Sequence, residues 1–292
     1  MEDKFIFKIS KNRNLGDGIV YYGLIENLCE TKNIDYIDLR TNCEKKNYIL
    51  IGSVLRNCDK NTIVCGAGFI SKNADLGCLD WSFKNKVYNN PKKILFVRGK
   101  KTREKLINMG VDCPEKYGDM GVILPLVYKN NIVKKRIKVG ILPHYVDKNK
   151  MDDLKNYLDE NNITYKVLNI MSAHNAKELI DDVCSCEYLI SSTLHGIILG
   201  ISYNIKTIWV KFSNNITGNN FKYYDFFSSL NIDYDSVKID KNILNNYIKV
   251  DNKDLYNLGY DILSLIPFFS NEETRKKKIN EWKLITSSYN TK

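Results

Sequence analysis

The chain lacks any apolar run long enough to cross a bilayer. None of its 292 residues belongs to a stretch of about eighteen consecutive apolar positions, the length that a membrane helix needs. The first residues, MEDKFIFKIS, also lack the pattern of a secretory signal peptide. We therefore expect a cytoplasmic protein, and its basic charge leaves peripheral contact with the inner membrane face open.

Metal-binding and nucleotide-binding signatures are also missing. Cys184 and Cys186 form a single Cys-x-Cys pair, and no second pair completes the spacing of a zinc site. Neither a G-x-G-x-x-G fingerprint nor a Walker loop occurs. We expect the eight cysteines to be reduced and mostly buried. The sequence thus predicts no bound metal and no cofactor.

Arginine and histidine are scarce in a chain that is otherwise rich in positive charge. Seven of the 44 basic residues are arginine, three residues are histidine, and the formal net charge is +10. The basic residues are dispersed and do not alternate with aromatic ones, so no nucleic-acid surface is predicted. A basic surface favours anionic substrates or an anionic membrane face.

Apolar segments of strand length alternate with segments of helix length along almost the whole chain. The expected strands are 4–9, 48–54, 62–65, 94–97, 137–142, 165–168, 188–191 and 207–210, and the expected helices are 17–30, 102–109, 150–160, 176–184, 194–203 and 221–230. This alternation predicts an α/β protein in which parallel sheets are covered on both faces. We expect two Rossmann-like, doubly wound domains that face each other across a cleft.

A polar, basic stretch at residues 128–136 divides the two blocks. We expect an N-terminal domain over residues 1–130, a C-terminal domain over residues 131–265, and a helical tail over residues 266–292 that packs back on the N-terminal domain. The oligomeric state is left open.

Residues 190–196, ISSTLHG, place His195 where an apolar strand ends and a helix begins. Ligands of α/β sheets bind at the carboxyl ends of strands, and helix N-termini there attract anions. Ser192 and Thr193 add hydroxyls and potential caps. An imidazole that titrates near neutrality is a credible acid or base at such a point. The alternative is a buried histidine that only bonds to a neighbouring strand.

Arg98 ends another expected strand, just before Gly99 and a helix. In a chain with so few arginines, this position suggests a need for the two parallel hydrogen bonds that guanidinium makes to a carboxylate or phosphate. A surface salt bridge is the alternative. Lys211 ends a later strand, and Lys222 lies in the first turn of a helix, where a facing anion would offset the unfavourable helix dipole.

Other strand ends carry small or polar side chains that we expect to contact the acceptor or line the cleft. They are Asn14, Gly16, Asp17, Gly66, Gly68, Asp119 and His144. For each of these the alternative is a structural role, as a capped turn, a close-packed strand end or part of a domain interface.

Taken in order, these segments resemble the polysaccharide pyruvyl transferase family. The matching motifs are NLGD (14–17), CGAGF (65–69), VRGKKT (97–102), YGDMGVILP (117–125), ILPHYVD (141–147), SSTLHGII (191–198) and TGNNFKYYDFF (217–227). Each motif is modest by itself, and their common order over residues 10–230 carries the resemblance.

The resemblance implies a glycosyltransferase-B-like pair of domains. It also implies transfer of pyruvate from phosphoenolpyruvate to two hydroxyls of one sugar, as a cyclic ketal, with no cofactor beyond this donor. The acceptor would be a sugar or lipid-linked oligosaccharide of a cell-surface polysaccharide. Two other functions stay open: a glycosyltransferase that uses a nucleotide sugar, and a non-catalytic protein that binds sugars or anions.

The resemblance assigns catalysis to His195 and Arg98. The expected donor-binding residues are Arg98, Ser192, Thr193, Leu194, His195, Gly196, Lys211 and Lys222. Some family members have arginine where this chain has Thr193, so we expect Lys211 or Lys222 to supply the missing positive charge.

Overall fold

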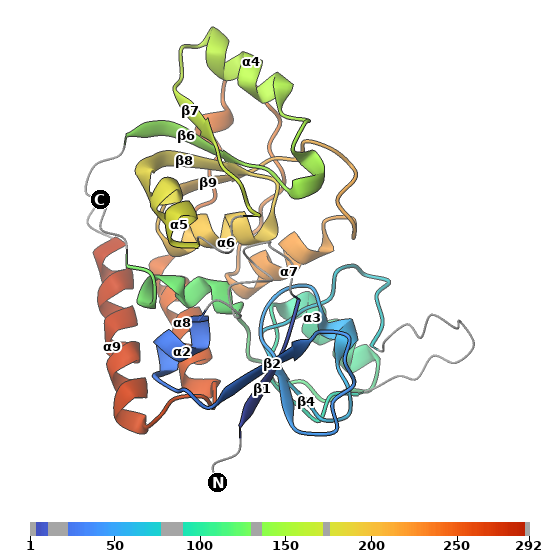
Figure 1. Cartoon of the computed structure of the whole chain (residues 1–292). Coiled ribbons are helices and arrows are strands. Elements are labelled where there is room, and N and C mark those ends of the chain that lie inside the picture. Colours follow the sequence, from blue (N-terminus) through green and yellow to red (C-terminus); the bar gives the residue numbers. More distant parts are fainter. Residues whose placement is uncertain (1–3, 11–22, 77–89, 130–135, 172–175, 290–292) are drawn as a thin grey trace.

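The computed structural model of this chain describes residues 4–10, 23–76, 90–129, 136–171 and 176–289. Two parallel β-sheets organise these residues (Figure 1). The first sheet contains β1 (Phe5–Ile9), β2 (Ile34–Asp38), β3 (Asn47–Ile49), β4 (Thr62–Cys65) and β5 (Lys93–Phe96), and the second contains β6 (Ile137–Leu142), β7 (Tyr165–Val167), β8 (Cys186–Ser191) and β9 (Lys206–Trp209).

Both sheets begin with the same strand order. The first runs β2-β1-β3-β4-β5 and the second runs β7-β6-β8-β9, and neighbouring strands are parallel throughout. In each sheet the chain order reverses beside the first strand, and ligands of such sheets bind at the strand ends next to this reversal. The prediction of a mixed α/β protein with parallel, Rossmann-like sheets is confirmed.

Helices connect the strands and cover the sheets. Their bounds are α2 (Ile25–Cys29), α3 (Lys100–Asn108), α4 (Asp152–Glu160), α5 (Ala176–Ser185), α6 (Leu194–Ser202), α7 (Phe221–Ser229), α8 (Asn252–Leu265) and α9 (Glu272–Ser288), with short 3₁₀ turns η2 (Leu55–Asn57), η3 (Met120–Leu126), η4 (Tyr145–Asp147) and η6 (Ile243–Asn245). In Figure 1, α4 lies on one face of the second sheet and α5 and α6 on the other.

Alternating strand residues supply both faces of the second sheet. Ile141 and Ile190 share a hydrophobic cluster with Leu154 of α4, whereas Leu142 and Leu189 belong to the cluster that contains α5 and α6. This alternation follows from the two-residue period of a strand, and burial on both faces is typical of parallel sheets.

The turn η3 joins the two sheets. All seven of its residues are buried, and it packs against α6 on one side and α8 and α9 on the other (Figure 1). A Cβ atom on Gly121 would lie only 3.0 Å from the side chain of Ile198, so glycine permits this close approach. One hydrophobic cluster therefore runs from the first sheet through η3 to α6.

The C-terminal helices lie on the side of the first sheet. Phe268, between α8 and α9, is fully buried and meets Phe5, Phe7 and Tyr48 edge-on at centroid distances of 5.3, 4.9 and 4.9 Å. Helix α8, which ends at residue 265, contacts β5 and η3, although residues up to 265 were expected to belong to the C-terminal domain. The domain boundaries at residues 130 and 265 stay a prediction.

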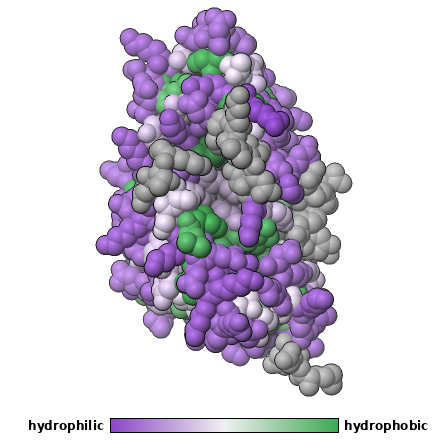
Figure 2. All heavy atoms as spheres, turned by 90° about the vertical axis from the view of Figure 1, so that its left-hand side faces the viewer, coloured by the Kyte–Doolittle hydropathy of each residue, from purple (hydrophilic) through white to green (hydrophobic). Residues whose placement is uncertain are grey.

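The face that carries α9 is largely hydrophilic, with a small hydrophobic patch near its middle (Figure 2). Leu284 of α9 is 72% exposed. Within the described residues, no helix combines the length and the hydrophobicity that crossing a membrane would take.

Candidate functional site

His195 lies in the first turn of α6, at the carboxyl end of β8. Thr193 caps this helix, because its Oγ1 accepts a hydrogen bond from the Gly196 N–H at 2.9 Å. The N–H groups of Leu194 and His195 belong to the first turn, where no intrahelical acceptor exists. The start of α6 therefore presents main-chain donors beside the imidazole, while the predicted hydroxyl of Thr193 is occupied as a cap.

The Nε2 atom of His195 is buried and has no hydrogen-bond partner among the described residues. Burial, together with the positive charges of Lys222, Arg98 and His144, lowers the pKa of His195 to about 3. The predicted titration near neutrality is therefore wrong for the unliganded protein, in which the ring is neutral at pH 7. A bound anion would raise this pKa again, because it would offset the surrounding positive charge.

Asp147 and Ser192 tie the end of β6 to the end of β8. The Ser192 hydroxyl donates to Oδ2 of Asp147 at 2.8 Å and accepts from the His144 N–H at 2.9 Å. The hydroxyl of Ser213 donates to the other carboxylate oxygen of Asp147. Burial and the charge of Lys222 lower the pKa of His144 to about 4, with Asp147 acting in the opposite direction. Ser192 thus positions His144 next to His195.

Arg98 is fully buried just beyond β5. Its Nε donates to Oδ2 of Asp225 at 2.9 Å, its Nη1 donates to the Ser53 hydroxyl at 2.7 Å, and its Nη2 donates to the main-chain oxygen of Phe69. Gly68 makes room for the guanidinium, since a Cβ there would lie 2.6 Å from its Cζ. The predicted bidentate contact with a donor anion is therefore replaced by contacts within the protein, and the ion pair is buried rather than on the surface.

Asp225 fastens α7 to α3. Its Oδ1 accepts from the Thr102 N–H and its Oδ2 from the Thr102 hydroxyl, both at 2.7 Å. One turn earlier on α7, Lys222 is 9% exposed and lies 5.3 Å from the centroid of the Tyr223 ring. Helix α7 therefore brings Lys222 to both histidines while Asp225 anchors the helix to the first sheet. The aromatic side chain of Tyr223 is buried in the core.

Asp119 is a fully buried carboxyl at the start of η3. Its Oδ1 accepts from the Gly121 N–H at 2.9 Å, and its Oδ2 has no partner in the described part of the chain. Burial raises the pKa of Asp119 to about 6, although the charge of Arg98 lowers it. Arg98 is paired directly with Asp225, and its charge acts on Asp119 only from a distance.

Lys211 lies apart from this group. Its Nζ is 4.0 Å from the carboxylate of Asp235 and 5.5 Å from the Trp209 ring centroid, and it lines a pocket with residues of α4. Lys222 therefore supplies the positive charge beside His195, and Lys211 does not.

Four other expected positions have a structural explanation or lie outside the described residues. Gly66 adopts a φ of +107°, and a Cβ there would lie 2.9 Å from the main-chain oxygen of Leu50, so glycine is required by the turn. Asn14, Gly16 and Asp17 lie outside the described residues. Among the residues that are described, no three histidine, cysteine, aspartate or glutamate side chains are grouped as metal ligands would be.

Sequence reasoning missed the carboxylates that organise the site. Asp225 stands alone among aromatic residues in FKYYDFF, and Asp147 follows His144 by three residues. A lone acidic residue in a largely aromatic helix is a usable signal, because such a residue is rarely buried without a cationic partner.

Comparison with known families places most of the chain in one family. Residues 14–214 match the family described as polysaccharide pyruvyl transferase. The chain belongs to the polysaccharide pyruvyl transferase family. The family match includes Arg98, Asp119, His144 and His195, and it ends before Lys222 and Asp225 of α7.

The relatives carry little functional description. An uncharacterized protein of Acanthamoeba polyphaga mimivirus is 29% identical over 203 residues, which are 67% of this chain and 66% of the relative. The chain thus spans slightly less than two thirds of that relative's length. A crystal structure of a functionally uncharacterized protein from Klebsiella pneumoniae subsp. pneumoniae NTUH-K2044 covers 77% of this chain and 88% of its own, with a TM-score of 0.45 and 13% identity.

Proposed function

We propose that this protein is a pyruvyltransferase that moves a pyruvyl unit from phosphoenolpyruvate onto two hydroxyls of one sugar in a polysaccharide or its precursor. Membership of the family supports this proposal. The observation that carries it is the buried Nε2 of His195 at a helix start, which has no hydrogen-bond partner among the described residues and is surrounded by the charges of Lys222 and Arg98. Phosphoenolpyruvate, with a phosphate and a carboxylate, supplies the anions that such surroundings attract.

Lys222 and the N–H groups at the start of α6 are the proposed donor-binding groups. Both lie beside His195, and a helix N-terminus stabilises a phosphate or carboxylate. Arg98 acts as a positioning residue: through Asp225 it holds α7, and its charge keeps His195 neutral until an anion binds. This role differs from the direct donor contact that the resemblance implied.

His195 is the proposed proton carrier. Donor binding raises its pKa, so the ring takes up a proton at Nε2 and passes it to the methylene carbon of phosphoenolpyruvate. A sugar hydroxyl then attacks the resulting cationic carbon, and its proton returns to the imidazole. The C–O bond to phosphate then breaks and phosphate leaves with the electron pair. The second hydroxyl attacks the same carbon to close the ketal, and its proton is taken up by the departing phosphate.

The proposal includes a glycosyltransferase-B-like arrangement of two domains. Supporting it, Arg98 and Asp119 follow or adjoin the first sheet, whereas His144 and His195 follow strands of the second. The acceptor, a sugar or lipid-linked oligosaccharide, would approach where these two sets meet.

Mass spectrometry of candidate oligosaccharides after incubation with phosphoenolpyruvate tests the function. The expected result is the mass gain of a pyruvyl ketal together with released phosphate. The variant His195→Gln should slow the transfer by about 10²–10⁴-fold, the usual contribution of a proton-transfer group, with a smaller effect on donor affinity. Consumption of a nucleotide sugar with no use of phosphoenolpyruvate would overturn the proposal in favour of a glycosyltransferase.

Calorimetry gives a second, independent check. Because His195 is neutral before donor binding, phosphoenolpyruvate should bind with uptake of a proton at pH 7, and its affinity should rise as the pH falls toward 6. Titrations in two buffers of different ionisation enthalpy measure this uptake. Uptake that persists unchanged in His195→Gln would assign the proton to another group.

A further inference from the structure

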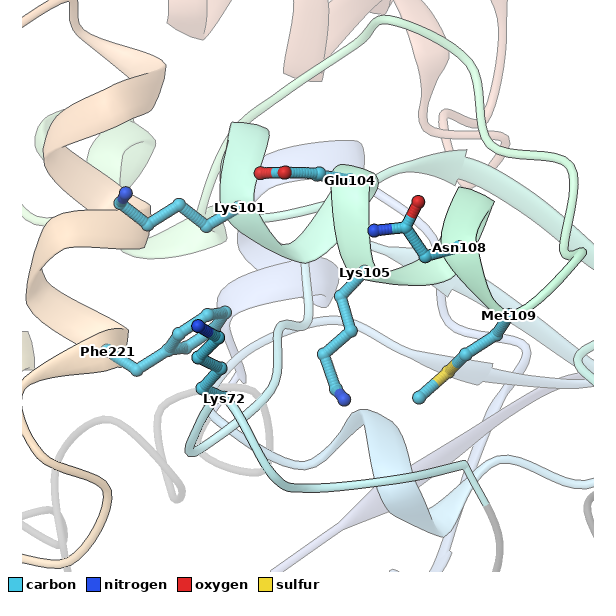
Figure 3. A pocket seen from close by; sticks show the side chains of 7 residues that line it. All are labelled: Lys72, Lys101, Glu104, Lys105, Asn108, Met109 and Phe221. Carbon is cyan, nitrogen blue, oxygen red and sulfur yellow. The ribbon is translucent and has the colours of Figure 1, made fainter.

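A pocket of about 420 Å³ lies along α3, next to the start of α7 (Figure 3). Its polar lining comes from Lys72, which follows β4, from Lys101, Glu104 and Lys105 of α3, and from Asn108 at the end of that helix. Phe221, the first residue of α7, forms an apolar wall. The proposed transferase chemistry uses none of these side chains.

The lining is unbalanced in charge. It holds three ammonium groups and a single carboxylate, that of Glu104. Lys105 is already engaged, because its Nζ lies 3.8 Å from a carboxylate oxygen of Asp75 and 5.2 Å from the Phe69 ring centroid. Within the described residues, Lys72 and Lys101 form no ion pair, and Figure 3 shows Lys101 extending from α3 toward α7. A concave surface with excess positive charge attracts anions.

The walls of the pocket are fixed before any ligand arrives. The buried carboxylate of Asp225 joins α7 to Thr102 of α3, and the Lys100 N–H donates to the Ser228 hydroxyl at 2.9 Å. The loop before α7 lies directly on the segment before Lys72, because any Cβ on Gly218 would collide with the main-chain oxygen of Ile70. Binding would therefore require little ordering of the main chain, which favours affinity.

The pocket and the candidate active site share helix α7. Phe221 lines the pocket, and the next residue, Lys222, acts on the two histidines. Successive residues of a helix advance by only about 1.5 Å along its axis. Because successive residues also point about 100° apart around the axis, Phe221 and Lys222 place the pocket and the two histidines on different sides of the first turn of α7.

We propose that this pocket binds the phosphate-bearing end of the acceptor, a glycosyl phosphate; this inference rests on the proposed transferase function. The ammonium groups of Lys72 and Lys101 bind the phosphate as compact point charges. Glu104 and Asn108 accept and donate hydrogen bonds to sugar hydroxyls, and the Phe221 ring covers an apolar face of the sugar. The volume lies within the range of about 300–1,000 Å³ that is typical of small-molecule pockets.

Calorimetric titration of the full chain with a panel of hexose 1-phosphates tests the pocket. At least one member should bind, and the double variant Lys72→Gln/Lys101→Gln should bind it at least about tenfold more weakly, a loss of about 1.4 kcal/mol. Lys241→Gln, which removes an exposed lysine near η6 on the second sheet, is the matched control and should bind normally. The affinity for phosphoenolpyruvate should be the same in all three proteins.

The outcomes separate the pocket from the proposed function. Failure of every hexose 1-phosphate to bind, equal binding by inorganic phosphate, or an unchanged affinity in the double variant would overturn the pocket assignment. A parallel loss of phosphoenolpyruvate affinity would also overturn it, by making the lysines part of the donor site. Lysine-dependent binding of a hexose 1-phosphate by a protein that ignores phosphoenolpyruvate would refute the transferase while leaving the pocket supported.

A further titration distinguishes a free sugar phosphate from one that is linked to a lipid carrier. The same sugar phosphate esterified with a short prenyl chain should bind more tightly if the acceptor is carrier-linked, and equally if it is a free sugar phosphate. Either result supports the pocket, whereas loss of binding on esterification would restrict the proposal to the free monoester.

Discussion

The two sides of the candidate site differ in how their charges are balanced. On the side of the first sheet, the guanidinium of Arg98 is sealed from solvent and neutralised by Asp225. On the side of the second sheet, Lys222 lies beside His144 and His195, and both imidazoles are neutral because of it and of their burial. On the first side, the charge of Arg98 is therefore already balanced within the protein. On the second side, the charge of Lys222 opposes protonation of both imidazoles, and a bound anion would offset it.

Removing the carboxylate of Asp225, which balances Arg98, should have the largest effect on stability. Asp225→Ala leaves the Arg98 guanidinium buried without its ionic partner, so we expect a loss of about 3–5 kcal/mol in the free energy of unfolding. Urea denaturation measures this loss. Asp35→Ala is the control, because the exposed pair of Asp35 with Lys4 should be worth less than about 1 kcal/mol. Equal losses of unfolding free energy in the two variants would show that the buried ion pair contributes no more than the exposed one, and would refute this account of Arg98 and Asp225.

Acid should destabilise the protein because burial keeps His195 unprotonated in the folded state. Below pH 6.5 an unfolded histidine takes up a proton that His195, with its pKa lowered to about 3, does not. Stability should therefore be complete above pH 6.5 and fall as the pH decreases. Between pH 7.5 and pH 5, wild type should lose on the order of 1–2 kcal/mol more than His195→Gln in urea titrations. Parallel pH profiles for the two proteins would mean that the imidazole is not sequestered.

Asp119 should give a pH dependence of stability that is opposite in sign to that of His195. Asp119 has its pKa raised to about 6, so its ionisation lowers stability as the pH rises from about 3.8 through 6. Asp119→Asn keeps an oxygen that accepts from the Gly121 N–H and removes the buried charge. We expect a gain of about 1 kcal/mol at pH 7.5 and none at pH 4, measured by thermal and urea unfolding. A loss at pH 7.5 would show that the ionised carboxylate is itself stabilising.

Lys211 should contribute least. Its ammonium group lies near Asp235 at an exposed position, outside the group around His195. Lys211→Gln should change stability by less than about 0.5 kcal/mol and leave phosphoenolpyruvate affinity unchanged. A marked loss of donor affinity in this variant would require the second side of the site to extend as far as the end of β9.

The sequence predicts most of the fold, and the reasons for the exceptions are physical. The strands 62–65 and 137–142 were expected with the bounds of β4 and β6, because short apolar runs bounded by turn residues are a local signal. Strand β2 was missed, although Ile34 and Tyr36 alternate with acidic residues as in a half-buried edge strand. The turn η3 has no comparable local pattern, since its seven residues are buried together and contain Pro125.

The site was predicted less completely, because its chemistry depends on contacts that are distant in sequence. The position of His195 at a strand end follows from residues 188–196 alone. The pKa of His195, however, depends on Lys222 and Arg98, which other elements bring beside it. The partner of Arg98 is 127 residues away, so no spacing rule could distinguish an anion-binding arginine from one that is already paired.

The burial of Phe268 against Phe5, Phe7 and Tyr48 has a consequence for biosynthesis. A ribosome delivers the strands of the first sheet early, but the ring that completes their core emerges only after all four strands of the second sheet. The first sheet is therefore synthesised first, but its aromatic core is completed only after the second sheet has been synthesised. Until residue 268 appears, the aromatic face of β1 and β3 is exposed to chaperones and to other nascent chains.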